Sequence, residues 1–231
     1  MEIVLSSDVE EQFANDQFSM LVEDFPNLHL RLCHNRASGP SRVNNLLRGF
    51  QACRNDYIAC IDDDDYLDIF AFDSIAPAFF LGKRPVVIMS SAVHNERWEI
   101  PDPEHATLAH SSVENEFPAS RWRTVFSGVN SLPICAALVP RAFLFSCLEN
   151  FEPEHDLSED FALFLHLFLS PGLPSVFESK RLFAHISLRD SENSVTMEDR
   201  RPWVRDIVGH LRQLTGDPRN AAPGKWALLC G

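Results

Sequence analysis

Short apolar stretches alternate with longer stretches of helical character along most of this 231-residue chain. Leu28, Leu30 and Leu32 alternate with polar residues, which is the period-two pattern of a strand with one buried face. The pattern predicts strands over 2–5, 28–33, 57–61, 85–89, 134–139 and 181–187. It predicts helices over 10–22, 43–50, 69–81 (kinked or broken at Pro77), 140–148, 161–169 and 196–211. Alternating strands and helices are typical of an α/β fold.

The apolar run 57–61 ends in four consecutive carboxylates, Asp62 to Asp65. A run of this density suits a strand that is covered on both faces, and ligands of such sheets bind beyond the carboxyl ends of the strands. If the strand continues through the carboxylates, Asp62 and Asp64 point to one side and Asp63 and Asp65 to the other. Two carboxylates on one side favour a divalent ion such as Mg²⁺ or Mn²⁺ that bridges substrate phosphates. A solvated acidic turn or the start of a helix is the alternative interpretation.

The length and composition predict one α/β domain over residues 1–215, followed by a tail over 216–231. The chain is 45% hydrophobic and 23% charged, as expected for a globular protein. Residues 91–126 form a polar stretch that contains three prolines and several histidines, and we expect it to be a long excursion from the core.

The chain carries 33 acidic and 20 basic residues, a formal net charge of −13, which makes nucleic acid an improbable partner. Its six cysteines are scattered without a C-x-x-C pair, which favours free thiols and a reducing compartment. No run approaches 18 uninterrupted apolar residues. These features predict a cytoplasmic protein, and they remain compatible with peripheral membrane contact.

Several short motifs occur in an order that resembles the GT-A fold glycosyltransferases of the family 2 type. The matching segments are 2–8, Gly39–Arg42, Tyr57–Asp65, Asn130 with Pro133, Ser158–Asp160, and Arg189 with 193–196. The resemblance implies a Rossmann-like fold, with a mostly parallel central sheet flanked by helices and a nucleotide-diphosphate sugar lying over it. The chain begins at what resembles the second strand of that family, so we expect the first strand of the nucleotide pocket to be absent from it.

The resemblance also implies a role for each matching residue. The chemistry would be transfer of a sugar from a nucleotide donor, most simply a UDP-sugar, to a saccharide, lipid or protein acceptor, with inversion at the sugar carbon. Mn²⁺ or Mg²⁺ would offset the charge of the diphosphate. The implied roles are general base for Asp160 with Glu159 beside it, donor binding for Asp8, Arg42, Asp62, Asp63 and Arg189, and metal binding for Asp64, Asp62 and His185.

Three other functions remain open at this point. A degenerate, non-catalytic GT-A-like binding module would explain the short amino-terminal part. A phosphatase of the D-x-D-x-T kind requires a small hydroxyl residue where Tyr66 stands. A nucleotidyltransferase shares the sheet and the metal-binding carboxylates, but its glycine- and Lys/Arg-rich phosphate loop would have to lie in the amino-terminal part that we expect to be missing.

Overall fold

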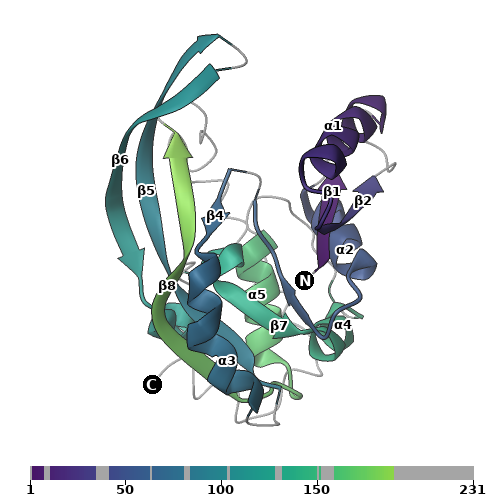
Figure 1. Cartoon of the computed structure of the whole chain (residues 1–231). Coiled ribbons are helices and arrows are strands. Elements are labelled where there is room, and N and C mark those ends of the chain that lie inside the picture. Colours follow the sequence, from purple (N-terminus) through teal and green to yellow (C-terminus); the bar gives the residue numbers. More distant parts are fainter. Residues whose placement is uncertain are drawn as a thin grey trace.

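The computed structural model of the chain describes residues 2–7, 11–34, 42–62, 64–80, 84–102, 105–127, 132–149, 151 and 159–189. These residues form a two-stranded sheet and a six-stranded sheet, with helices on their faces (Figure 1). The predicted helix over 196–211 and the tail over 216–231 lie outside the described residues. The predicted α/β class is confirmed.

The amino-terminal part is a strand–helix–strand–helix unit, as the sequence pattern predicts. It consists of β1 (Glu2–Ser7), α1 (Glu11–Asp24), β2 (His29–His34) and α2 (Arg42–Ala52). β1 and β2 run parallel, in register from Glu2 opposite His29 to Ser7 opposite His34. Gly49 of α2 lies so close to β1 that an added Cβ would stand 3.2 Å from the Cβ of Ser6. A side chain at this position would therefore push the helix away from the strand.

The larger sheet is mixed, so the expectation of a mostly parallel sheet is wrong. It contains β3 (Tyr57–Ala59), β4 (Tyr66–Leu67), β5 (Val86–Asp102), β6 (His105–Phe117), β7 (Ala137–Pro140) and β8 (Val176–Arg189). The strand order is β3–β7–β5–β8–β4, and β6 pairs with β5. Only β5 and β8 are parallel in this sheet, because β7 returns antiparallel between β3 and β5 and β4 runs antiparallel to β8.

The core lies between this sheet and α5 (Glu159–Leu169), which is apolar nearly all round. Phe161, Phe164 and Leu165 are at most 2% exposed, as expected of a helix that is covered on every side. α4 (Arg141–Leu148) packs beside α5, and α3 (Phe72–Phe80) covers a second apolar cluster. The predicted helix over 69–81 is divided into the 3₁₀ turn η1 (Ile69–Ala71) and α3, but α3 continues through Pro77, so the break predicted at Pro77 is wrong.

The polar stretch 91–126, which we predicted to be a long excursion from the core, consists mostly of strands. Most of it belongs to β5 and β6, which pair as a long hairpin that projects beyond the helices (Figure 1), and the 3₁₀ segment η2 (Ala119–Ser127) follows. Polar residues suit such an arm because most of β6 buries neither of its faces. The predicted strand over 134–139 likewise begins as a 3₁₀ turn, η3 (Ile134–Ala136), before β7.

Among the described helices, none is both long enough and apolar enough to cross a bilayer.

Candidate functional site

Asp62, Asp64 and Asp65, which follow β3, lie in a turn that we call the acidic turn. β3 ends at Ala59, and the N–H of Asp65 donates to the carbonyl oxygen of Asp62 at 3.2 Å. The predicted strand-like alternation of these side chains is therefore wrong, because the backbone curls back on itself here. The alternative interpretation, an acidic turn, describes the local backbone correctly.

The first turn of α2 approaches the acidic turn and supplies a cation. Nη2 of Arg42 lies 2.7 Å from Oδ2 of Asp62, and the two side chains are 57% and 35% exposed. On the same turn of α2, Asn45 donates its Nδ2 to the carbonyl oxygen of Ser6 at 3.1 Å and accepts from the Ser6 hydroxyl. The carboxyl end of β1, the start of α2 and the acidic turn therefore lie at one edge of the molecule. Ligand sites of α/β sheets lie at this kind of edge.

The side chain of Asp65 points inward instead. Its Oδ1 accepts the backbone N–H of Ser187 at 3.1 Å, and its Oδ2 lies 3.6 Å from Sγ of Cys135. The pKa of Asp65 is raised to about 6, chiefly because the carboxyl group is buried; the Ser187 hydrogen bond lowers this pKa, and the negative charges of Asp62 and Asp64 raise it. Asp65 thus differs from Asp62 in the acidic turn, because its carboxylate accepts a hydrogen bond from β8.

Two histidines and a tyrosine lie together beside Asp65. Nε2 of His94 lies 2.8 Å from Nδ1 of His185, and the rings of Tyr66 and His185 are parallel within 3° at 4.6 Å. Burial lowers the pKa of His185, the neighbouring His94 lowers it as well, and Asp68 opposes both effects. The lowered pKa of His185 favours the neutral form of its imidazole.

The predicted metal ligands are only partly brought together. Asp62 and Asp64 share the acidic turn, whereas Nδ1 of His185 is hydrogen-bonded to His94. Within the described ranges, no three histidine, cysteine or carboxylate side chains form a group that could hold a metal ion. The assignment of Asp62, Asp64 and His185 to a metal stays a prediction.

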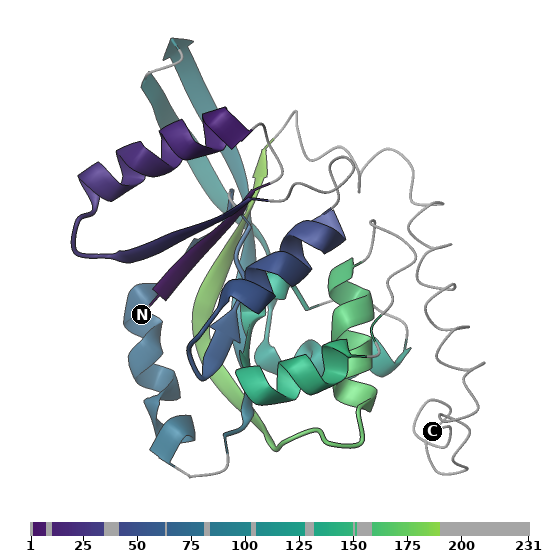
Figure 2. The ribbon, with the colours of Figure 1, turned by 90° about the vertical axis from the view of Figure 1, so that its right-hand side faces the viewer.

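The remaining predicted site residues are placed unevenly. Asp160 is the second residue of α5, half-buried, and its Oδ1 accepts the N–H of Phe161 at 2.7 Å. In Figure 2, the first turns of α2 and of α5 are the upper ends of these two helices. Asp8 and Asp63 lie outside the described residues, and so do the side chains of Glu159 and Arg189.

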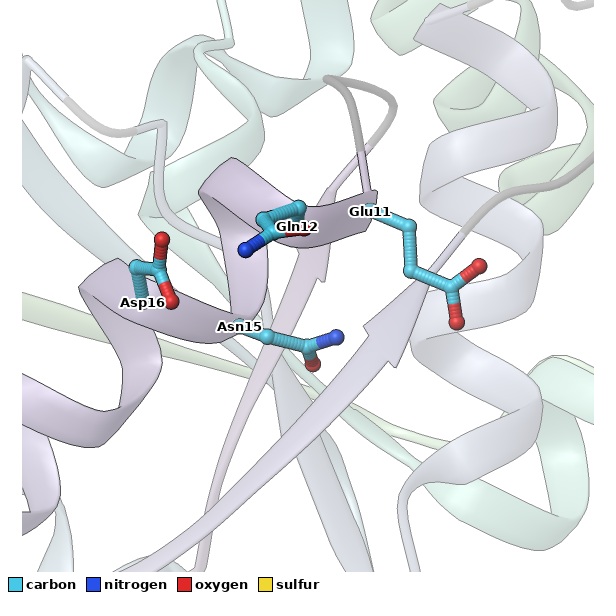
Figure 3. Close-up of a pocket in the computed structure, with 4 residues that line it drawn as sticks. All are labelled: Glu11, Gln12, Asn15 and Asp16. Carbon is cyan, nitrogen blue, oxygen red and sulfur yellow. The ribbon is translucent and has the colours of Figure 1, made fainter.

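A polar hollow lies against the first two turns of α1. Its lining consists of two carboxylates and two amides, from Glu11, Gln12, Asn15 and Asp16 (Figure 3). None of the residues that the sequence singles out lines it. An acidic hollow of this kind repels a diphosphate, so it adds nothing to the site at the acidic turn.

Sequence reasoning missed several residues of this region, namely His94, Glu96, Tyr66 and Ser187. His94 and Glu96 come from the polar stretch that looked like a loop, and each contacts a β8 residue 91 positions later. The only local signal is the closely spaced histidine and carboxylate, His94 and Glu96, in a polar segment. It becomes informative only when the pairing of β5 with β8 is known.

Comparison with solved structures defines the fold further. No family model matches the sequence, and no curated protein does. The structure is similar to that of residues 1–349 of TarS from S. aureus, with a TM-score of 0.59 at 16% identity, over 99% of this chain. It is similarly close to the same fragment in complex with UDP-GlcNAc (TM-score 0.59, 20% identity) and with UDP (TM-score 0.56, 18% identity).

The chain therefore has an α/β fold that resembles the fold of TarS. It spans about 60% of the length of that TarS fragment. Because the identity is low, the likeness defines the fold alone.

Proposed function

We propose that this protein transfers a sugar from a nucleotide-diphosphate donor to an acceptor hydroxyl, with the donor bound over the acidic turn. The observation that carries the proposal is the contact of Arg42 with Asp62 at the carboxyl-end edge of an α/β fold that resembles TarS. This arrangement places a cation and acidic ligands side by side, which is what a charged diphosphate requires. TarS has been crystallised with UDP-GlcNAc and with UDP, which supports a uridine nucleotide as the donor.

The acidic turn fits Mn²⁺ or Mg²⁺ in its donor chemistry. Both ions prefer oxygen ligands, and Mg²⁺ is commonly held by one or two carboxylates together with substrate phosphates and water. Asp62 and Asp64 would hold the ion, with His185 as a further ligand. A bound ion would supply positive charge that stabilises the departing diphosphate.

The other contacts to the donor follow from the family resemblance. Arg42 would bind the diphosphate, Asp8 the base, Asp63 the sugar nucleotide, and Arg189 would cover the phosphates from the end of β8. The guanidinium of Arg42 is more than half exposed, so it can reach a ligand from its present position. Arginine matches phosphate geometry well because its planar fork donates two parallel hydrogen bonds.

Asp160 would be the general base, with Glu159 beside it at the start of α5. Asp160 would take the proton of the acceptor hydroxyl as its oxygen forms a bond to the sugar carbon, and the bond from this carbon to the diphosphate would break on the opposite face, so that the carbon is inverted. The position of Asp160 in the first turn of α5 suits a carboxylate, because the helix dipole favours negative charge there. Saccharide, lipid and protein hydroxyls all remain candidate acceptors.

A binding module without catalysis is the second candidate. It is favoured by the finding that protein groups already contact two of the proposed metal ligands, since Arg42 pairs with Asp62 and His94 bonds to His185. A bound ion would compete with these contacts. Such a module would bind UDP or a sugar without turnover.

Release of UDP from UDP-GlcNAc with Mn²⁺ separates the two candidates. Asp160→Asn should lower the rate by at least about 100-fold, the usual contribution of a general base, and leave the affinity for UDP within about twofold. Asp73→Asn, an exposed carboxylate on α3, is the matched control and should change neither quantity. No release by the folded wild-type protein favours the binding module, and equal loss of affinity in Asp160→Asn means that the residue is structural.

A further inference from the structure

Asp65 connects the acidic turn to two other elements of the fold. It is the last residue of the acidic turn, directly before β4, and its side chain reaches β8 by accepting the N–H of Ser187 at 3.1 Å. Its second carboxylate oxygen lies 3.6 Å from the thiol of Cys135, a buried residue of η3. Both contacts lead away from the solvent-facing side of the turn.

The register of the sheet explains why Ser187 needs this contact. β4 pairs with β8 at only two positions, Tyr66 opposite His185 and Leu67 opposite Ala184. An antiparallel strand extended by two residues would bring Asp64 opposite Ser187, but the backbone has already curled into the turn there. Ser187 is 2% exposed, so its N–H needs a partner within the protein. The carboxylate of Asp65 takes the place of the missing backbone acceptor.

A second carboxylate holds the same serine from the other side. The hydroxyl of Ser187 donates to Oε2 of Glu96 at 2.6 Å, and Glu96 is 4% exposed on β5. Taking carboxylates out of water is costly unless their hydrogen bonds are made. Two such bonds to one residue therefore favour a single placement of β8 between β5 and the acidic turn.

We propose that Asp65 is a positioning residue, which holds the acidic turn against the end of β8 and is not itself a ligand of metal or diphosphate. The consequence for binding rests on the proposed function. Asp62 and Asp64 on the turn, and His185 and Arg189 on β8, are expected to serve one donor molecule. The Asp65–Ser187 hydrogen bond fixes the distance between these two groups.

The side-chain chemistry of asparagine separates positioning from ligation. Asp65→Asn keeps an oxygen that can accept the N–H of Ser187, but it loses the charge that a metal ligand needs. Asp65→Ala loses both, and Asp65→Ser, which is too short to reach β8, replaces it if the alanine variant does not fold. Asp56→Asn is the matched control, because Asp56 precedes the opposite end of β3 with a 71% exposed side chain.

The first readout needs no ligand. Hydrogen exchange of the Ser187 amide, followed by NMR in the free protein, should be at least about tenfold faster in Asp65→Ala, equivalent to about 1.4 kcal/mol. It should stay within about threefold of wild type in Asp65→Asn and Asp56→Asn. An unchanged Ser187 amide in the folded alanine or serine variant would overturn the proposed anchor.

The second readout is the affinity for UDP with Mn²⁺ measured by calorimetry. We expect a loss of about tenfold in Asp65→Ala and less than threefold in Asp65→Asn. Equal losses in both variants, with the Ser187 amide still protected in Asp65→Asn, would show that Asp65 is a ligand. Unchanged affinity in Asp65→Ala would restrict its role to the fold. Absence of UDP binding by the wild-type protein would refute the proposed function alone, because the exchange experiment still decides the anchor.

Discussion

Replacement of Arg42 by alanine should have opposite effects on the binding of Mn²⁺ alone and of UDP. The guanidinium lies 2.7 Å from Oδ2 of Asp62 and is the cation that the described contacts place on the acidic turn. While it is present, it lowers the attraction of the turn for a divalent ion. When UDP binds, the same charge attracts the diphosphate. Arg42→Ala should therefore strengthen binding of Mn²⁺ alone and weaken binding of UDP.

The exposure of the pair sets the size of the effect. Side chains that are 57% and 35% exposed form an ion pair of about 0.2–1 kcal/mol, because water and salt screen the charges. In Arg42→Ala a bound ion no longer has to disrupt this ion pair, so the affinity for Mn²⁺ should rise by about 1.4- to 5-fold. UDP affinity should fall by at least about 10-fold, because a hydrogen bond to a charged group contributes about 1.5–3 kcal/mol.

Titration calorimetry at low ionic strength measures both quantities. Arg84→Ala is the matched control, because Arg84 forms a similar exposed ion pair with Asp56 at 3.0 Å. Asp56 directly precedes β3, at the end of this strand away from the acidic turn. Arg84→Ala should leave both affinities unchanged. If Arg42→Ala weakens binding of Mn²⁺, or if Arg84→Ala produces the same changes, the electrostatic role assigned to Arg42 is wrong.

Two further predictions concern stability. Phe161→Ala should lower the free energy of unfolding by about 3–5 kcal/mol in urea titrations, because the ring is fully buried, whereas Phe70→Ala, at 71% exposure, should change it by less than about 0.5 kcal/mol. Similar losses in both would contradict the assigned core. Burial lowers the pKa of His166, whose ring donates to the carbonyl of Cys147 at 3.0 Å, so the unfolded chain takes up the proton first as the pH falls below about 6.5. Wild type should therefore lose stability between pH 7 and pH 5 relative to His166→Gln, and parallel pH profiles would refute this.

Local patterns in the sequence identified most of the helices. α2 shows an amphipathic spacing and α5 a continuous apolar run, and each pattern is set by which face of the helix is buried. The hairpin of β5 and β6 was missed because most of β6 lies outside the core and its polar residues resemble a loop. The start of the apolar run at Ile134 was assigned to a strand because a short buried 3₁₀ turn has the same composition.

The site was predictable only where its residues stand in short motifs. Arg42 and Asp62 follow from the order of the motifs, and the structure places them in contact. The partners of Asp65 and His185 depend on β8 lying between β4 and β5, and this arrangement joins residues that are 91 to 122 positions apart. No local pattern encodes such pairings. The direction of each side chain in the acidic turn was equally hidden, because four identical residues carry no periodic signal.

Binding of UDP to the wild-type protein and to Asp64→Ala, with and without Mn²⁺, is the most direct test of a nucleotide-sugar site at the acidic turn. Mn²⁺ should strengthen UDP binding to the wild type, and this gain should be lost in Asp64→Ala while Asp73→Asn behaves as wild type. Binding of UDP that is equally strong in Asp64→Ala with Mn²⁺, or no binding by the folded wild-type protein, would contradict the proposed site.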